Sequence, residues 1–177
     1  MSCVDSHMES LCMSLQKTPG KALVMEIAAE AVGDAAVLEA LLQLMSDGDD
    51  SLRRHAAWAV EQVSRLSPRL LEGRYREVAE LAMASGVPEG FRRLLLGILY
   101  NLPDEDSLNV ALFNFLLDKM VDPHSSSGVQ ALAMKLAARM SRAVDGLHEE
   151  FLCILRNMEP QYYSTGVRSV MRNCLKR

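Results

Sequence analysis

The sequence has 177 residues, a formal net charge of −4 at pH 7, and a hydrophobic fraction of 49% in which only 5% of residues are aromatic. A chain of this length can bury a sizeable core within one domain, and a core of Leu, Ala and Met favours helices. The acidic balance weighs against nucleic-acid binding without a local basic patch, and no apolar stretch is long enough to span a membrane.

Apolar residues recur at helical spacing along the whole chain, which predicts an all-α protein. We expect a single domain over residues 1–177, with a short helix over 5–16 and a terminal helix over 165–175. Between them we expect four helical pairs, at about 21–46, 51–85, 89–121 and 126–158. Proline and glycine mark most of the breaks between these segments, because proline removes a backbone donor and glycine favours turns.

The acidic turn at Asp47–Asp50 resembles the start of a calcium-binding loop. Such a loop requires a glycine at its sixth position and a glutamate at its twelfth, and this sequence has Leu52 and Trp58 there. The turn is therefore interpreted as a cap for the next helix, supplied by Asp50 or Ser51. No metal and no cofactor are implied.

A period of 38 residues organises the chain from the second helical pair onward. Three sets of equivalent residues follow it: Gly90, Gly128 and Gly166; Tyr75, Phe113 and Phe151; and Val60, Ile98, Leu136 and Cys174. A helical pair that recurs at about 40 residues cannot bury its apolar face alone and must stack on its neighbours. The period predicts a right-handed α-α superhelix, an α-solenoid of about four helical pairs with flanking helices.

The 38-residue helical pair, with Asp or Pro in its inner turn, resembles the HEAT repeat family. Two shorter stretches, Ala111–Asp118 and Pro160–Ser164, are similar to small uncharacterised HEAT-like proteins of gut Bacteroidetes. The resemblance implies a solenoid, and it implies little about function, because one fold serves many roles. In arrays of this family the second helices usually line the concave side, which would carry these polar residues: Arg74, Glu77, Asn109, Asn114, Asp118, Glu150 and Asn157.

Arginines recur near the start of the first helix of each pair, and they are the candidate binding residues: Arg53, Arg54, Arg92, Arg93 and Arg168. Arg54 and Arg92 are 38 residues apart (92 − 54), and Gln130 breaks the row. A cation opposes the helix dipole at this end, so its recurrence needs a reason. One reason is a structural ladder of ion pairs with Glu72, Asp104 or Asp106 of neighbouring repeats. The other is an exposed edge that binds phosphate or carboxylate groups.

Two further features have a structural and a functional interpretation. Trp58, the only tryptophan, is interpreted as a packing residue, with a binding anchor as the alternative. The last helix carries Arg168, Arg172, Lys176 and Arg177 beside its apolar stripe. It is interpreted as a terminal capping helix, with a membrane or nucleic-acid contact as the alternative.

The sequence contains no recognisable catalytic motif: the residue four positions after His148 is Leu152, so no zinc-protease pair is present. The acidic N-terminal stretch is unlike a secretory signal, and the cysteines Cys3, Cys12, Cys153 and Cys174 show no paired spacing, so we expect a cytoplasmic protein with reduced thiols. We predict a non-catalytic module that binds another protein. A nucleic-acid-binding protein related to the helical DNA glycosylases is the alternative, and self-association is left open.

Overall fold

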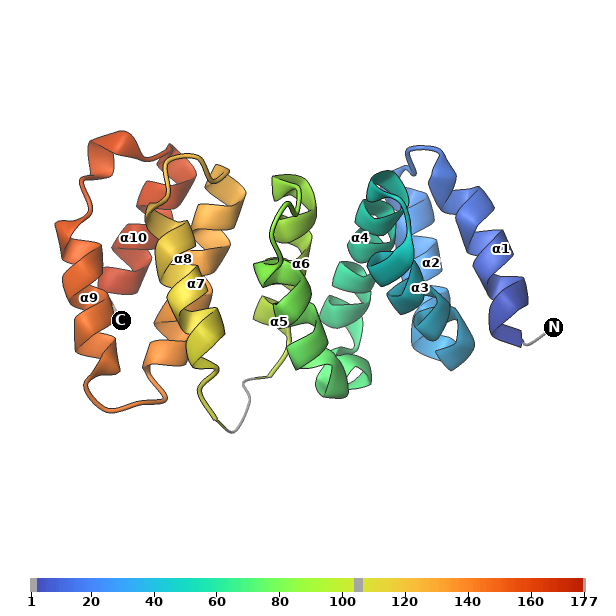
Figure 1. The fold of residues 1–177 in the computed structure, drawn as a ribbon, viewed down its shortest axis with the longest axis horizontal. Helices are drawn as coiled ribbons and strands as arrows, with labels where there is room; N and C mark the ends of the chain where they lie inside the picture. Colours follow the sequence, from blue (N-terminus) through green and yellow to red (C-terminus); the bar gives the residue numbers. More distant parts are fainter. Residues whose placement is uncertain (1–2, 104–106, 177) are drawn as a thin grey trace.

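In the computed structural model, which describes residues 3–103 and 107–176, the chain is built from α-helices and short 3-10 helices, and no strand occurs in these residues. The elements follow one another along an extended array (Figure 1). Their bounds are α1 (Cys3–Gln16), α2 (Lys21–Gly33), α3 (Ala35–Asp47), α4 (Asp50–Leu66), η1 (Pro68–Arg74), α5 (Tyr75–Met83), α6 (Glu89–Asn101), α7 (Val110–Val121), α8 (Ser127–Ser141), α9 (Leu147–Asn157), η2 (Pro160–Tyr162) and α10 (Thr165–Leu175). The predicted all-α solenoid is confirmed.

Short polar side chains fix where several helices begin. The side chains of Asp34, Asn109, Ser126 and Ser164 each accept a hydrogen bond from a backbone N–H in the first turn of the following helix. At α4 the cap is Asp49, which accepts from Ser51 N and Leu52 N, so the prediction of a cap at Asp50 or Ser51 is wrong by one or two residues.

The second part of the helical pair expected at about 51–85 is divided in the structure. Residues Pro68–Arg74 form the 3-10 helix η1, and α5 begins only at Tyr75. Gly73 lies in this segment and costs helical stability, while Pro68 starts it without a backbone donor.

The residues that recur every 38 positions form the core between stacked helices. Tyr75, Phe113 and Phe151 are all buried, and so are the four equivalent residues of the first helices, Val60, Ile98, Leu136 and Cys174. Each helical pair therefore buries its apolar face against the next pair, as a solenoid requires. None of the described helices is long and apolar enough to cross a membrane.

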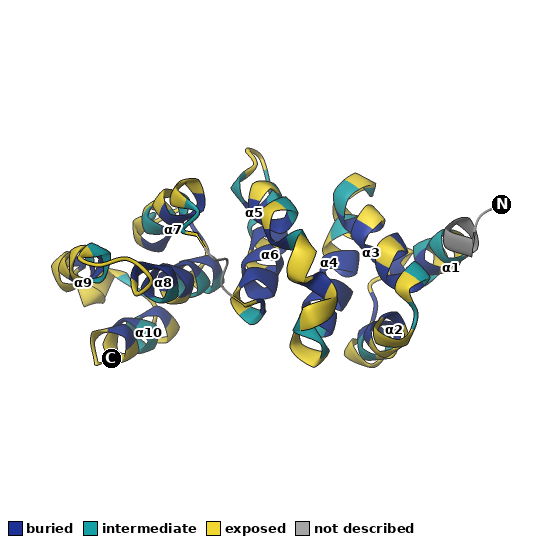
Figure 2. Ribbon diagram, turned by 90° about the horizontal axis from the view of Figure 1, so that it is seen from below, coloured by how far each residue is buried: buried dark blue, intermediate teal, exposed yellow. Residues whose placement is uncertain are grey.

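The even-numbered helices α2, α4, α6, α8 and α10 pack on one another in series, whereas the odd-numbered helices α5, α7 and α9 are splayed apart. Viewed from below, the even-numbered helices form an arc whose two ends, α2 and α10, turn to the same side (Figure 2). We call the even-numbered helices the inner layer and the odd-numbered helices the outer layer. The prediction that second helices line the concave side is wrong: Glu77 of α5 and Asp118 of α7, for example, belong to the outer layer.

Candidate binding surface

The predicted arginines separate into a bonded group and an exposed group. Arg53 donates from Nε to the Met45 carbonyl at 3.2 Å, and Arg92 donates from Nη2 to the Ala84 carbonyl at 3.1 Å. Gln130 donates from Nε2 to the Asp122 carbonyl at 2.9 Å. Each donor bonds to a carbonyl eight residues before it (53 − 45, 92 − 84, 130 − 122), so Arg53, Arg92 and Gln130 are equivalent, and we call them the carbonyl-binding row.

The carbonyl-binding row explains why cations recur at an unfavourable helix end. Met45, Ala84 and Asp122 lie in the last turn or at the C-cap of α3, α5 and α7, where carbonyls lack partners within the helix. A cation that binds there meets the favourable, negative end of the preceding helix dipole. That gain and the hydrogen bonds offset the unfavourable position at the start of the arginine's own helix.

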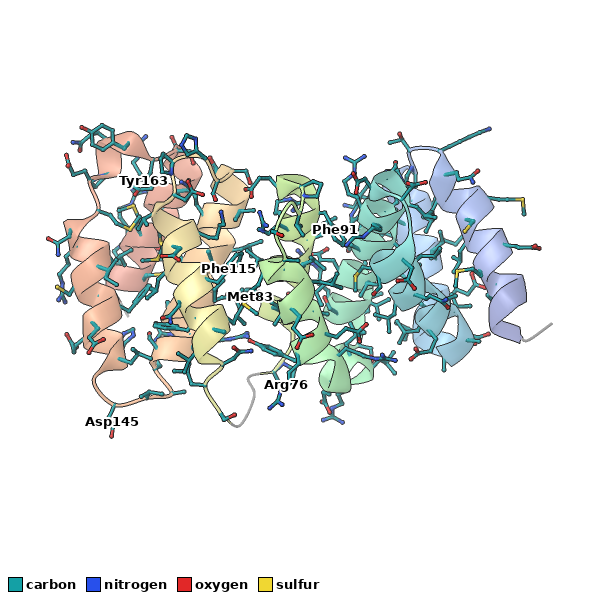
Figure 3. All side chains as sticks on the ribbon, in the orientation of Figure 1. Arg76, Met83, Phe91, Phe115, Asp145 and Tyr163 are labelled. Carbon is teal, nitrogen blue, oxygen red and sulfur yellow. The ribbon has the colours of Figure 1, made fainter. Side chains whose placement is uncertain are left out.

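The bonds to carbonyls replace the predicted ladder of ion pairs. Within the described residues, Arg92 pairs with Glu89 of its own helix at 2.9 Å, and no contact joins the predicted arginines to Glu72. Asp104 and Asp106, the other predicted partners, lie outside the described residues. Aromatic rings complete the sites: the guanidinium of Arg53 lies over Phe91 at 4.8 Å, and that of Arg92 lies over Phe115 at 5.7 Å. The two rings are labelled in Figure 3.

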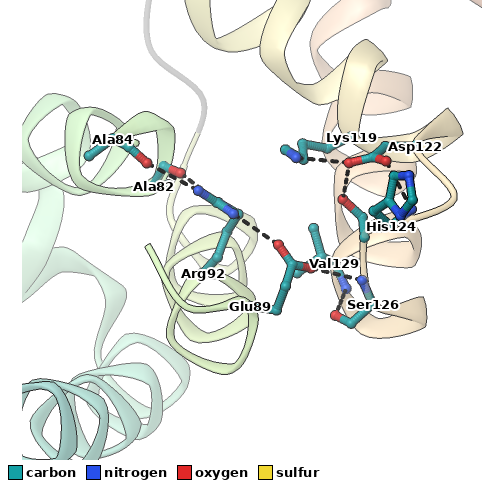
Figure 4. A network of polar contacts seen from close by, with 10 residues as sticks. Ala82, Ala84, Glu89, Arg92, Lys119, Asp122, His124, Ser126 and Val129 are labelled. Carbon is teal, nitrogen blue, oxygen red and sulfur yellow. Dashed lines mark hydrogen bonds and ion pairs between the residues drawn. The ribbon is translucent and has the colours of Figure 1, made fainter. Parts of the chain in front are cut away.

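Glu89 joins two neighbouring repeats through the bonded arginine (Figure 4). Its Oε1 accepts from Arg92, and its Oε2 accepts from the backbone N–H of Ser126 at 2.8 Å, just before α8. Burial acts to raise the pKa of Glu89, but the hydrogen bonds from Ser126 and Arg92 outweigh it and lower that pKa. Glu89 is therefore held as a carboxylate in a structural role.

Among the predicted arginines, Arg54 and Arg93 are the exposed ones. The stem of Arg93 crosses α8 at Gly128, where an added Cβ would lie 2.7 Å from Arg93 Cδ. The stem of Arg54 passes Gly90 in the same manner, at 3.9 Å from the position of a Cβ. Two of the three repeated glycines thus leave room for an arginine of the preceding repeat. Arg93 forms no hydrogen bond or ion pair within residues 3–103 and 107–176.

The remaining predicted site residues do not join this group. Arg168 lies at the start of α10, and its guanidinium donates to Thr165 Oγ1 at 3.1 Å, so it binds no carbonyl of the preceding repeat. Trp58 is half-buried and packs against the core, which agrees with the packing interpretation. The structure brings Arg53 and Arg92 into equivalent sites and leaves Trp58 and Arg168 outside them.

Sequence reasoning missed a basic cavity at the C-terminal end of the inner layer. A cavity of about 490 Å³ lies between α6, α8 and α10, and four cationic side chains line it: Lys135, Arg139, Arg142 and Lys176. The sequence does contain a pattern that could have predicted part of this cavity: Lys135, Arg139 and Arg142 are spaced by four and three residues and therefore share one face of α8. The 38-residue period does not reveal it, because the residues 38 positions before Lys135 and Arg142 are Gly97 and Asp104.

The described residues contain no group of three or more His, Cys, Asp or Glu side chains that could hold a metal ion. The described cysteines Cys12 and Cys153 are free thiols, and Cys153 is exposed. The exposed cations of the inner layer carry guanidinium and ammonium groups, which bind anionic oxygens.

Comparison with known proteins identifies the repeat. Residues 11–177 match the HEAT repeat domain family. No curated protein and no solved structure matches the chain. Because the match extends over nearly the whole sequence and the structure is a stack of helical pairs, the chain belongs to the HEAT repeat domain family.

Proposed function

We propose that the chain is a non-catalytic protein-binding module, an adaptor whose inner layer receives an acidic partner. The observation that carries this proposal is the distribution of charge over the four C-terminal α-helices, α7 to α10. The inner helices α8 and α10 contain no Asp or Glu, and their cations are Lys135, Arg139, Arg168 and Arg172. The outer helices α7 and α9 contain Asp118, Glu149 and Glu150.

Two general properties support a protein as the partner. Stacked helical repeats present extended concave surfaces that commonly bind other proteins. A surface of one charge also steers an oppositely charged partner towards it and discriminates against other partners. We further propose a bacterial, cytoplasmic protein. The resemblance inferred from Ala111–Asp118 and Pro160–Ser164 implies a bacterial source, and the free thiols of Cys12 and Cys153 agree with a reducing compartment.

The test is capture of a binding partner that depends on the inner layer. The purified chain serves as bait in a lysate of the cells that encode it, and the charge-reversed variant Arg54→Glu with Arg93→Glu serves as the comparison. We expect the wild type to recover a protein in stoichiometric amount and the variant to lose it. Cross-links between bait and partner should then map to α4, α6, α8 and α10.

A matched control separates the inner layer from total charge. Arg69 and Arg156 are exposed on η1 and α9 of the outer side, so Arg69→Glu with Arg156→Glu makes the same charge change elsewhere. The control variant should retain the partner, and its loss would contradict a specific inner surface. Loss of the captured protein after nuclease treatment would favour the nucleic-acid alternative, and turnover in a broad substrate screen would contradict a non-catalytic role.

A further inference from the structure

The basic cavity identified above lies on the inner layer, between three consecutive even-numbered helices. Tyr100 borders it from the end of α6, Lys135, Arg139 and Arg142 border it from α8 and its C-cap, and Asn173 and Lys176 border it from α10 and its C-cap. Among the described residues, the lining contains four cationic side chains and no carboxylate. A protein with a net charge of −4 thus concentrates positive charge at one site.

Three of these cations are not neutralised by the protein. Within residues 3–103 and 107–176, Lys135, Arg142 and Lys176 form no ion pair with an acidic side chain. All three are exposed to solvent. Like charges around one cavity repel one another, and an anion bound between them would relieve that repulsion.

The fourth cation, Arg139, has a structural role that shapes the site. Its guanidinium donates to the carbonyls of Tyr100 at 2.8 Å and Leu99 at 3.1 Å, at the C-terminal end of α6. The ring of Tyr100 meets two cations, with Lys135 Nζ at 5.5 Å and Arg139 Cζ at 5.6 Å from its centroid. These contacts hold Arg139 and Lys135 in place before a ligand arrives, which lowers the ordering cost of binding.

We propose that this cavity binds an extended acidic segment of a partner protein, with Lys135, Arg142 and Lys176 each contacting a carboxylate. The proposal rests on the protein-binding function proposed above and names the chemistry of the partner.

The spacing of the cations favours several carboxylates over one compact anion. Lys135 and Arg142 are seven residues apart on one face of α8, so their backbones are separated by about 10 Å. Side chains two or four residues apart on an extended chain point to the same side and are separated by about 7 or 13 Å, respectively. A peptide with acidic residues at alternate positions therefore matches this separation.

The single aromatic residue described at the site, Tyr100, makes the site less suited to nucleic acid than to an acidic peptide. Single-stranded nucleic acids gain much of their affinity when bases stack on aromatic rings. Tyr100 is the only aromatic residue that lines this cavity, and its ring already engages Lys135 and Arg139. An acidic peptide needs the cations and not the ring.

Fluorescence anisotropy with synthetic peptides tests the proposal directly. The probe is a labelled peptide of alternating Glu and Ser, and the matched peptide carries Gln in place of Glu. We expect the Glu peptide to bind the full chain and the Gln peptide not to bind. Lys135→Glu with Arg142→Glu should weaken binding by about tenfold or more, since two favourable contacts become repulsive. Affinity should also fall with added salt.

Controls make each outcome decisive. Arg69→Glu with Arg156→Glu should change the affinity less than about threefold, because neither residue lines the cavity. Circular dichroism verifies folding, and Lys135→Gln with Arg142→Gln replaces the reversed pair if that variant does not fold. Equal binding by wild type and variant, or tighter binding of a serine phosphopeptide or an oligothymidine, would overturn the proposal.

The two proposals fail separately. If the chain captures a cellular protein through Arg54 and Arg93 but does not bind the Glu peptide, the cavity proposal is wrong and the protein-binding module stands. If the Glu peptide binds in the cavity and no cellular protein is recovered, the adaptor function is wrong and the anion site stands.

Discussion

Arg92 is the most extensively bonded cation among the described side chains of the inner layer. It is 8% exposed and donates to two carbonyls, Ala82 and Ala84, and to the carboxylate of Glu89. Removing a buried group of this kind is costly, because its former partners stay buried without a hydrogen bond and their desolvation is no longer compensated. Arg92 therefore stabilises the fold and does not bind a ligand, although its sequence position resembles that of the exposed arginines.

Truncation of this arginine should destabilise the protein strongly. We expect Arg92→Ala to lower the free energy of unfolding by about 2 to 4 kcal/mol. Arg92→Gln should cost about half of that, because Gln130 in the next repeat makes the equivalent carbonyl bond through its amide. Urea unfolding measures both variants, with the exposed Arg93→Ala as a control that should stay within about 0.5 kcal/mol. Equal losses for Arg92→Ala and Arg93→Ala would contradict the assignment.

Asp122 makes the turn between α7 and α8 sensitive to pH. Hydrogen bonds from His124 N, Lys119 and Ser125 lower its pKa from 3.8 to about 2. Because the folded pKa is below the unfolded one, the carboxylate stabilises the fold fully above about pH 4, and this contribution is lost as the pH falls through 2. Asp122→Asn should lower the Tm at pH 6, and its Tm should converge with that of the wild type near pH 2. The control Asp145→Asn, at an exposed site, accounts for loss of one acidic charge, and a Tm difference that stays constant with pH would contradict this role.

At the scale of the helices, the sequence predicted the packing residues better than the polar ones. The buried rows, such as Tyr75, Phe113 and Phe151, follow the 38-residue period because stacked helices require an apolar residue at each equivalent place. The arginines were misaligned by one residue, since the N-caps Asp49 and Pro88 are 39 apart (88 − 49), whereas Pro88 and Ser126 are 38 apart (126 − 88). The single extra residue makes Arg53, and not Arg54, the equivalent of Arg92.

The curvature and the basic cavity could not be predicted for a different reason. A sequence period indicates which residues are equivalent. Which side of the array is concave depends instead on how closely the helices within each layer approach one another. The cavity joins Tyr100 of α6 with Lys135 and Lys176 of α8 and the α10 C-cap, and no sequence spacing relates these three residues. Their proximity is a product of the stacking itself.

The glycines that recur every 38 residues allow the contacts between neighbouring helices to be tested. Gly128→Ala improves helix propensity but places a Cβ where the Arg93 stem now lies. In an Arg93→Ala background, we expect Gly128→Ala to stabilise the protein by about 0.5 to 1 kcal/mol. In the wild type the gain should be reduced or abolished, giving a coupling energy of about 0.5 kcal/mol or more in a double-mutant cycle. Gly166→Ala, which meets only Ser164 Oγ at 3.9 Å, is the uncoupled control. A coupling energy of zero would show that the position of the Arg93 side chain does not require a glycine at residue 128.

At the scale of the whole molecule, a solenoid should unfold from the end that is weakened. Each repeat contacts only its neighbours, so stability is close to a sum of repeat and interface contributions. Met45 in α3 and Met171 in α10 are both buried, with exposures of 0% and 3%, and they lie near opposite ends of the array (Figure 1). Truncating either one to alanine removes similar apolar volume and should cost about 2 to 4 kcal/mol locally.

The matched pair Met45→Ala and Met171→Ala therefore reports how far destabilisation spreads. Hydrogen exchange of each variant should show faster exchange near the substitution, in α1–α4 for Met45→Ala and in α8–α10 for Met171→Ala. The opposite end should keep its protection, because no helix bridges the two ends of the stack. Uniform loss of protection in both variants would mean that the array unfolds as one cooperative unit. A local response would also predict that Met171→Ala weakens binding of the acidic peptide, since α10 supplies one side of the basic cavity, while Met45→Ala leaves that binding unchanged.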